Sequence, residues 1–347
     1  MAFIDEVLQR PSYGWTNANG ELVKPSSRQL WKEAFGRMNI FRSLKNWISF
    51  ASLMMVISFL PFLYFFLFHY FTIQLAVALV VYAMIVMGTH GTIWFHRYGT
   101  HKSYQFSHPI WRVITQNLVI KTLPEEIYVV SHHVHHSKSD EPGDPYNAQA
   151  GFLYCMLAEF NHQRISPNLN EEQYRKVVHF MKHTGVTTNS YQQYQKWGSV
   201  ATPAYTVLVW ALNWAFWYGA FFLIGGHALA CAMFSAALLW FVGVRAFNYT
   251  GHGKGEEKHV EGVDFDRSNL SVNQLRPGLF AGEWHNNHHL YPGSARAGFL
   301  SYQLDLPWIY IYTLYKLGAV SSYRDSKKDF LKRYVKQECK EVVIKPE

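Results

Sequence analysis

Two long apolar stretches dominate the pattern of hydrophobic and polar positions. No Asp, Glu, Lys or Arg occurs from residue 47 to 95, or from residue 198 to 244. A helix needs about 20 residues to cross roughly 30 Å of hydrocarbon, so each stretch is long enough for two crossings. With a short break in each, the pattern predicts four transmembrane helices, at residues 47–68, 73–95, 204–223 and 228–247.

The two short breaks contain no Lys or Arg; they are His69-Tyr70-Phe71-Thr72 and Ile224-Gly225-Gly226-His227. All 32 basic residues therefore lie in the N-terminal region, the long middle segment or the C-terminal region. The positive-inside rule places these regions in the cytoplasm and the two tight turns outside. We therefore expect an all-α integral membrane protein, with four transmembrane helices in two hairpins and a cytoplasmic helical cap.

The chain divides into three predicted parts: a cytoplasmic N-terminal arm at residues 1–46, a membrane catalytic domain at 47–320 and a charged C-terminal tail at 321–347. A basic helix is expected around residues 29–42, as an interfacial lead-in to the first span. Its surroundings also offer cations to the phosphate groups of a lipid or carrier, namely Lys32, Arg37, Arg42 and Lys45. Residues 109–120 form an amphipathic stretch expected to lie at the membrane interface.

Composition supports the membrane assignment. Only 16% of the 347 residues are charged, whereas soluble domains carry roughly 25%. The net charge of +8 does not indicate nucleic-acid binding, because the basic residues flank apolar spans and form no aromatic-laced surface. The three cysteines, Cys155, Cys231 and Cys339, are scattered, so neither a disulfide framework nor a thiolate metal site is expected.

Histidine is the residue type that suggests chemistry. Two boxes have the pattern H-x-x-H-H, and on a helix their members share a face and are expected to point at a common spot. A looser pair follows the second span and one histidine follows the fourth, so in the predicted topology all of them reach the cytoplasmic side. Together they make nine of the 18 histidines: His96, His101, His132, His135, His136, His252, His285, His288 and His289.

Nine imidazoles without a thiolate are too many for one tetrahedral zinc ion, which takes four ligands. They suggest two metal ions, each with four or five histidines and an open position. Asn248, four residues before His252, is a possible further ligand, directly or through water. Each cluster alone also fits interfacial or surface histidines, and only their joint occurrence on one side favours a di-metal site.

These motifs resemble the three histidine boxes of membrane fatty acid desaturases. The first is His96 to His101 (H-x4-H), and the other two are the H-x-x-H-H boxes. Asn248-Tyr249-Thr250-Gly251-His252 looks like the N-x-x-x-H element of the acyl-CoA delta-9 desaturase-like branch, and Asp144-Pro145-Tyr146-Asn147 looks like its D-P-x-N turn. Gly282-Glu283-Trp284 departs from the G-E-G-W of the animal enzymes, and residues 290–299 look like the bacterial members.

The resemblance implies an O2-dependent oxidoreductase with two iron ions, which introduces a double bond into a fatty acyl chain. The acyl carrier is left open among coenzyme A, acyl carrier protein, lipid and free acid. Because the H-P-G-G haem signature is missing, electrons are expected from an external donor such as ferredoxin, rubredoxin or cytochrome b5 with a reductase. The implied location is a bacterial inner membrane with a cytoplasmic active site.

The proposed chemistry is consistent with the residues, because an alkyl C–H bond is not acidic enough for a histidine base to remove its proton. Oxygen activated at a metal is needed, within a dry apolar tunnel. Candidates for the tunnel wall are Trp94, Phe95, Trp210, Trp214 and Trp240. The alternatives left open are a fatty acid decarboxylase that forms terminal 1-alkenes, an acyl hydroxylase and, from another class, a membrane metal transporter or metal-binding protein.

Overall fold

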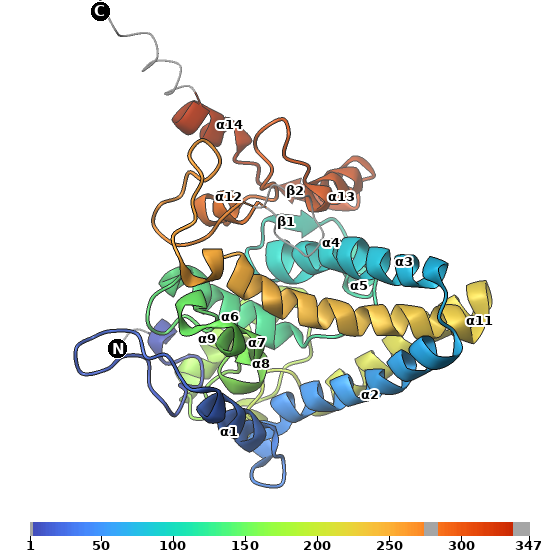
Figure 1. The fold of residues 1–347 in the computed structure, drawn as a ribbon, viewed down its shortest axis with the longest axis horizontal. Helices are drawn as coiled ribbons and strands as arrows, with labels where there is room; N and C mark the ends of the chain where they lie inside the picture. The colour runs from blue at the N-terminus through green and yellow to red at the C-terminus, as the bar shows by residue number, and fades with distance from the viewer. Residues whose placement is uncertain (1–2, 274–283, 336–347) are drawn as a thin grey trace, which may run out of the picture.

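The computed structural model describes residues 3–273 and 284–335 of the chain. Long helices lie side by side toward one end of the molecule, and shorter helices gather at the other end (Figure 1). The α-helices and strands are α1 Ser27–Met38, α2 Trp47–His69, α3 Ile73–Val81, α4 Gly88–Gly91, β1 Tyr104–Phe106, α5 Pro109–Gln116, α6 Glu125–Lys138, α7 Phe152–Met156, α8 Ala158–Asn161, α9 Glu171–Met181, α10 Tyr191–Trp197, α11 Pro203–Thr250, α12 His285–Leu290, α13 Leu306–Lys316, β2 Val320–Tyr323 and α14 Lys327–Phe330.

Three helical stretches are long and apolar enough to cross a membrane: Leu44–His69, Ile73–Thr100 and Pro203–Thr250. The first contains α2 and matches the predicted span at 47–68 closely, with Pro61 tolerated inside the helix. Thr72 begins the second stretch by accepting a hydrogen bond from the Leu75 backbone N–H. These two helices pack against α11 and form most of the apolar core.

The third stretch, α11, folds back on itself. Gly225 and Gly226 have non-helical backbone angles, and Gly226 has φ +66°, which favours glycine because a Cβ would be strained there. The rings of Trp214 and Phe234 are 6.3 Å apart, although 20 residues of continuous helix would separate them by roughly 30 Å. Segments 203–224 and 227–250 therefore form an antiparallel pair, as the Gly-Gly break predicts.

The end of the second span is the clearest difference from the prediction. Helix continues to Thr100, with π-helical turns at η3 (Tyr82–Met87) and η4 (Thr92–Thr100), so His96 lies inside the helix and His101 caps it. The prediction followed hydropathy and gave only the apolar part of this helix, and the end of the membrane span at residue 95 stays a prediction. Polar side chains beyond it are buried with partners: Arg97 donates to Asp305 and to the Ala295 carbonyl. π-helical geometry inside an α-helix is rare and is frequently found at functional sites.

The remaining helices cover one end of the long helices. α1 covers most of the expected basic helix, and a capping box between Ser26 and Gln29 begins it. The fold is mostly helical, but a two-stranded antiparallel ribbon pairs Tyr104 with Tyr323 and Gln105 with Ser322. This ribbon corrects the purely α expectation, and β2 crosses the predicted boundary at 320/321. It holds the segment after α13 against the end of the second span.

Candidate metal centre

Four separate elements supply the nine predicted histidines. His96 lies in η4 and His101 directly after it, α6 carries the second box, α12 carries the third, and His252 follows α11. The ring nitrogens of these residues converge from segments up to 193 positions apart (289 minus 96). The structure therefore brings together every histidine that the spacing singled out.

The nine histidines form two groups, and within each group one nitrogen per residue lies within 4.8 Å of the others. The five-histidine group is His96, His101, His132, His136 and His288, and the four-histidine group is His135, His252, His285 and His289. Each H-x-x-H-H box is therefore divided, which corrects the expectation that its members share one spot. Residues i and i+4 are about 40° apart around a helix and stay together, whereas residue i+3 lies about 100° from i+4 and turns to the other group.

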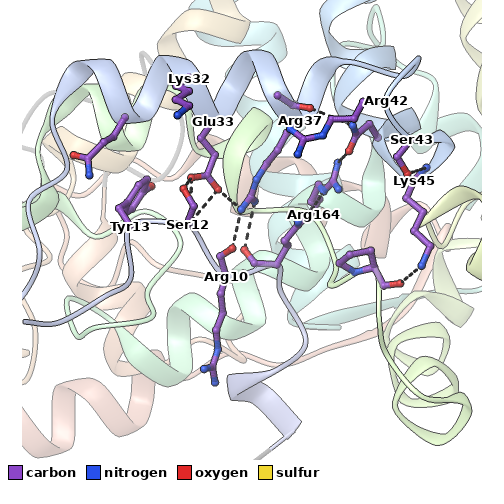
Figure 2. A pocket seen from close by; sticks show the side chains of 15 residues that line it. Arg10, Ser12, Tyr13, Lys32, Glu33, Arg37, Arg42, Ser43, Lys45 and Arg164 are labelled. Atoms are coloured by element: carbon purple, nitrogen blue, oxygen red, sulfur yellow. Dashed lines mark hydrogen bonds and ion pairs between the residues drawn. The ribbon is translucent and has the colours of Figure 1, made fainter.

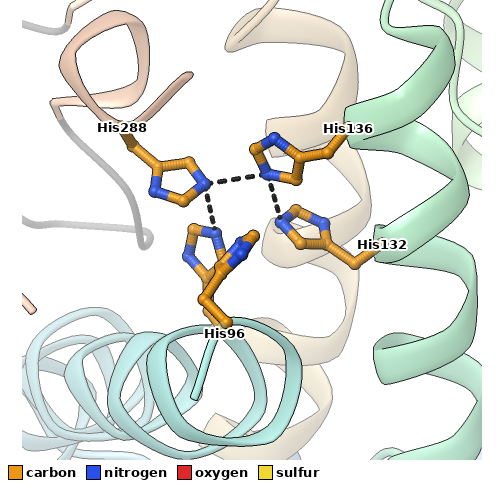
Figure 3. A group of neighbouring side chains, drawn as sticks. His96, His132, His136 and His288 are labelled. Carbon is orange, nitrogen blue, oxygen red and sulfur yellow. Dashed lines mark hydrogen bonds between the residues drawn. The ribbon is translucent and has the colours of Figure 1, made fainter. Parts of the chain in front are cut away.

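The spacing of the ring nitrogens fits metal binding. Nε2 atoms are 2.8 Å apart in His96 and His288, and 2.9 Å apart in His136 and His288 (Figure 3). The His252–His285 and His285–His289 pairs are at 3.0 and 3.2 Å. Two nitrogens that bind one ion at about 2.1 Å and at a right angle to each other are about 3.0 Å apart. His101 Nε2 is buried and has no hydrogen-bond partner among the described residues, as expected of an atom placed to bind an ion.

Burial favours the neutral, metal-binding form of the histidines on α6 and of His288 on α12. Burial lowers the pKa of His132, His135 and His288 well below the usual value, and neighbouring histidines lower each pKa further. For His136, burial lowers the pKa to about 3. A neutral imidazole has a free nitrogen lone pair, so these side chains are ready to act as ligands without first losing a proton.

Two carboxylates and one hydroxyl contact the outer nitrogens of the histidines. His135 Nδ1 donates to Asp144 Oδ1 at 2.9 Å, and His252 Nδ1 donates to Asp140 Oδ2 at 3.0 Å. His132 Nδ1 lies 3.1 Å from the Tyr146 hydroxyl. Such partners fix which nitrogen faces a metal and orient the ring. The sequence analysis identified the turn that carries Asp144 and Tyr146 but missed this role and the role of Asp140; acidic residues soon after a histidine box were the available signal.

The two spacer asparagines of the third box anchor the short helix α12, and both are fully buried. Asn286 accepts hydrogen bonds from the backbone N–H groups of Phe265 and Asp266 and donates to two carbonyls. Asn287 donates to the Ala297 carbonyl and to Gln303 Oε1. These bonds hold a six-residue helix that would be too short to form alone. Gly282 and Glu283, before the box, lie outside the described residues.

The structure does not assign a ligand or tunnel role to the other predicted candidates. Asn248 is half-buried in the last turn of α11, and its role as a ligand stays a prediction. His133 packs on Phe180 with ring centroids 4.6 Å apart, and His90 Nε2 bonds the Thr115 carbonyl, so both have structural partners. Of the tunnel candidates, Phe95 and Trp240 line a buried cavity of only about 10 Å³, too small for an acyl chain. An open tunnel also stays a prediction.

Comparison with known proteins adds independent information. Residues 73–308 match the model of the family described as fatty acid desaturase. The chain is 29% identical to an sn-1 stearoyl-lipid 9-desaturase of Anabaena variabilis over 71% of this chain and 82% of that protein. It is 25% identical to delta-9 acyl-lipid desaturase 1 of Arabidopsis thaliana, over 84% and 85%. It is 24% identical to a hex-5-enoyl-acyl-carrier-protein acetylenase of Moorena producens, over 72% and 76%.

Proposed function

Because the chain belongs to the fatty acid desaturase family and is an oxidoreductase of the desaturase type, we propose that two iron ions carry its chemistry. The five-histidine group would hold one ion and the four-histidine group the other, and imidazole nitrogens would surround both ions. The observation that carries this proposal is the convergence of nine histidines into two adjacent groups. Bound iron would supply the activation of O2 that cleavage of an unactivated C–H bond requires.

The proposed reaction removes two neighbouring hydrogens from a fatty acyl chain and forms a C=C bond. The two hydrogens and their two electrons, with two further electrons and two protons, reduce O2 to two water molecules. The further electrons come from an external protein, and ferredoxin, rubredoxin and cytochrome b5 are the candidate donors. The chain's own residues position the ligands and exclude water, since the side chains around the site are buried.

For the membrane topology we propose four spans, with the halves of α11 as the third and fourth. The histidine side would face the cytoplasm of a bacterial inner membrane, and the turns at residues 70–72 and 224–227 would face the opposite side. The absence of Lys and Arg from both turns supports this orientation. A metal transporter is less well supported, because the Asn213 amide is already engaged: it accepts from the Lys121 N–H and donates to the Val119 carbonyl.

A basic pocket supports a phosphorylated carrier for the acyl chain. It has a volume of about 780 Å³ and lies where α1 meets the start of α2 (Figure 2). Glu33 is the one carboxylate among its described lining residues, and Arg37 pairs with it. The cationic side chains around the pocket are Arg10, Lys32, Arg37, Arg42, Lys45 and Arg164. A net excess of positive charge beside the first span suits a phosphate-bearing head group of a lipid or a soluble carrier.

Product analysis tests the proposed function. The protein would be expressed with a matched reductase and electron donor, and fatty acids and headspace hydrocarbons would be profiled together by mass spectrometry. We expect a new internal double bond. An odd-carbon 1-alkene would instead identify a decarboxylase, and hydroxylated chains alone would identify a hydroxylase. Feeding acyl-CoA, acyl-acyl-carrier-protein, phospholipid and free acid in parallel identifies the carrier.

A further inference from the structure

The two histidine groups differ in what contacts their outer nitrogens. In the four-histidine group, two members donate to carboxylates: His135 to Asp144 and His252 to Asp140. In the five-histidine group the Tyr146 hydroxyl meets His132, and no carboxylate contacts a member among the described residues. One group therefore has two carboxyl groups in contact with its histidines, and the other has one phenol hydroxyl.

Both carboxylates lie in one turn, which follows α6 and is held by hydrogen bonds to its own backbone. Asp144 is fully buried and also accepts hydrogen bonds from the backbone N–H groups of Asp140 and Tyr146. Asp140 has φ +63°, a left-handed conformation that costs energy in residues other than glycine and that Asp tolerates better than most. Its Oδ2 also accepts from the Leu270 N–H at 2.7 Å. The left-handed backbone at Asp140 and the three hydrogen bonds from backbone N–H groups together orient both carboxylates toward the four-histidine group.

The partner of a ligating histidine affects the ion that it holds. A carboxylate that accepts from Nδ1 leaves Nε2 as the donor atom and makes the imidazole a stronger electron donor. Nearby negative charge also favours the more highly charged of two oxidation states. The four-histidine group has one histidine fewer than its neighbour, and it is the group whose members contact the two carboxylates.

We propose that Asp140 and Asp144 are positioning residues that make the two iron positions unequal. The four-histidine position binds its ion more tightly than it would without these carboxylates, and its ion is the more easily oxidised of the pair. This inference rests on the proposed function, since it presumes iron in both groups. The inference also assigns different roles to the two positions: the ligands of the four-histidine position donate electrons more strongly to their ion.

Mössbauer spectroscopy of the intact protein loaded with ⁵⁷Fe tests this assignment. The wild type should show two doublets of equal area, one for each position. In D144N and in D140N, one doublet should change while the other stays, and the affinity for one of the two ions should fall about 10- to 100-fold in competition with a chelator. Y146F is the matched control, because it removes only the hydroxyl, which among the nine histidines contacts His132 of the five-histidine group, so this substitution should change the other doublet.

The possible outcomes separate this inference from the proposed function. If the wild type binds no iron, the proposed function fails. Suppose instead that the wild type binds two iron ions, and that D144N and D140N leave both doublets unchanged or shift both equally. The proposed function then stands, and only the inference that the two positions are unequal fails. A Y146F spectrum that changes the same doublet as D144N would also overturn it. D140N keeps the inference testable if D144N does not fold, because Asp140 is less buried than Asp144.

Discussion

The guanidinium of Arg97 donates to the carboxylate of Asp305 at 2.8 Å, across 208 positions of sequence. Arg97 follows the first histidine of the site, and Asp305 begins α13, beyond the third box. Asp305 also accepts hydrogen bonds from the backbone N–H groups of Ala297 and Gly298. This ion pair therefore connects the end of the second span to the segment that follows α12.

Removing one partner of this buried pair should destabilise the protein. We expect Asp305→Ala to lower the free energy of unfolding by about 3–5 kcal/mol, because the Arg97 charge is left buried without its partner. Thermal unfolding in detergent measures the effect. The exposed pair of Glu171 and Arg175 is the control, where Glu171→Ala should cost at most about 1 kcal/mol. Equal effects at the two sites would contradict a structural role for Arg97–Asp305.

His288 contacts both His96 and His136 and is the member of the third box that joins the five-histidine group. We expect His288→Ala to lower bound iron from about two ions to about one and to reduce product at least about 100-fold. Iron analysis and product profiling measure both. His227→Ala, at the turn of α11, is the control and should keep both values. Product retained in His288→Ala would remove this residue from the ligand set.

Glu126 should make stability depend on pH. Burial raises its pKa from 4.5 to about 8, although the Ala201 N–H donates to its carboxylate. Between pH 4.5 and about 8 the folded protein holds a proton that the unfolded chain has released, so stability falls as the pH rises through this window. Glu126→Gln should flatten this slope in detergent unfolding between pH 5 and 8, and the exposed Glu21→Gln should not. An unchanged slope in Glu126→Gln would refute the raised pKa.

The basic pocket should contribute to the binding of substrate and not to the chemical step. Lys32 and Arg42 are exposed in it, and removal of either charge by Gln should raise KM about fivefold, since one phosphate contact near a membrane surface is worth about 1 kcal/mol. We expect kcat to stay within about twofold. Lys328→Gln, on α14 at the opposite side of the molecule (Figure 1), is the control. A fall in kcat with unchanged KM would contradict a role of the pocket in substrate binding.

Labelling of introduced cysteines tests the topology. In a Cys339→Ser background, Leu223→Cys should react with an impermeant maleimide from the outer side and Lys328→Cys from the cytoplasmic side. Leu223 lies beside the α11 turn and is 85% exposed, and the native Cys155 and Cys231 are buried. Reaction of both cysteines from one side would exclude the four-span arrangement.

The sequence predicted all nine histidines of the two groups because their spacing is a local property. It also predicted the break in α11 from two adjacent glycines. The division of each box between the groups, and the carboxylates at Asp140 and Asp144, depend on how distant segments meet, which a spacing rule does not contain. The extension of the second helix to Thr100 was missed for a similar reason. A charged residue such as Arg97 marks the end of an apolar stretch in the sequence, and only the fold shows that Asp305 pairs with it inside the protein.

The division of the boxes has a consequence for how the centre keeps its dimensions. Among the described residues, the two groups consist of histidines alone, and no single side chain belongs to both. Instead, α6 and α12 each contribute to both groups, and the fixed rise and rotation of a helix set the offset between their donor atoms. The two helices together set the distance between the two histidine groups. A change in the pitch or tilt of either helix would therefore move donor atoms of both groups at once.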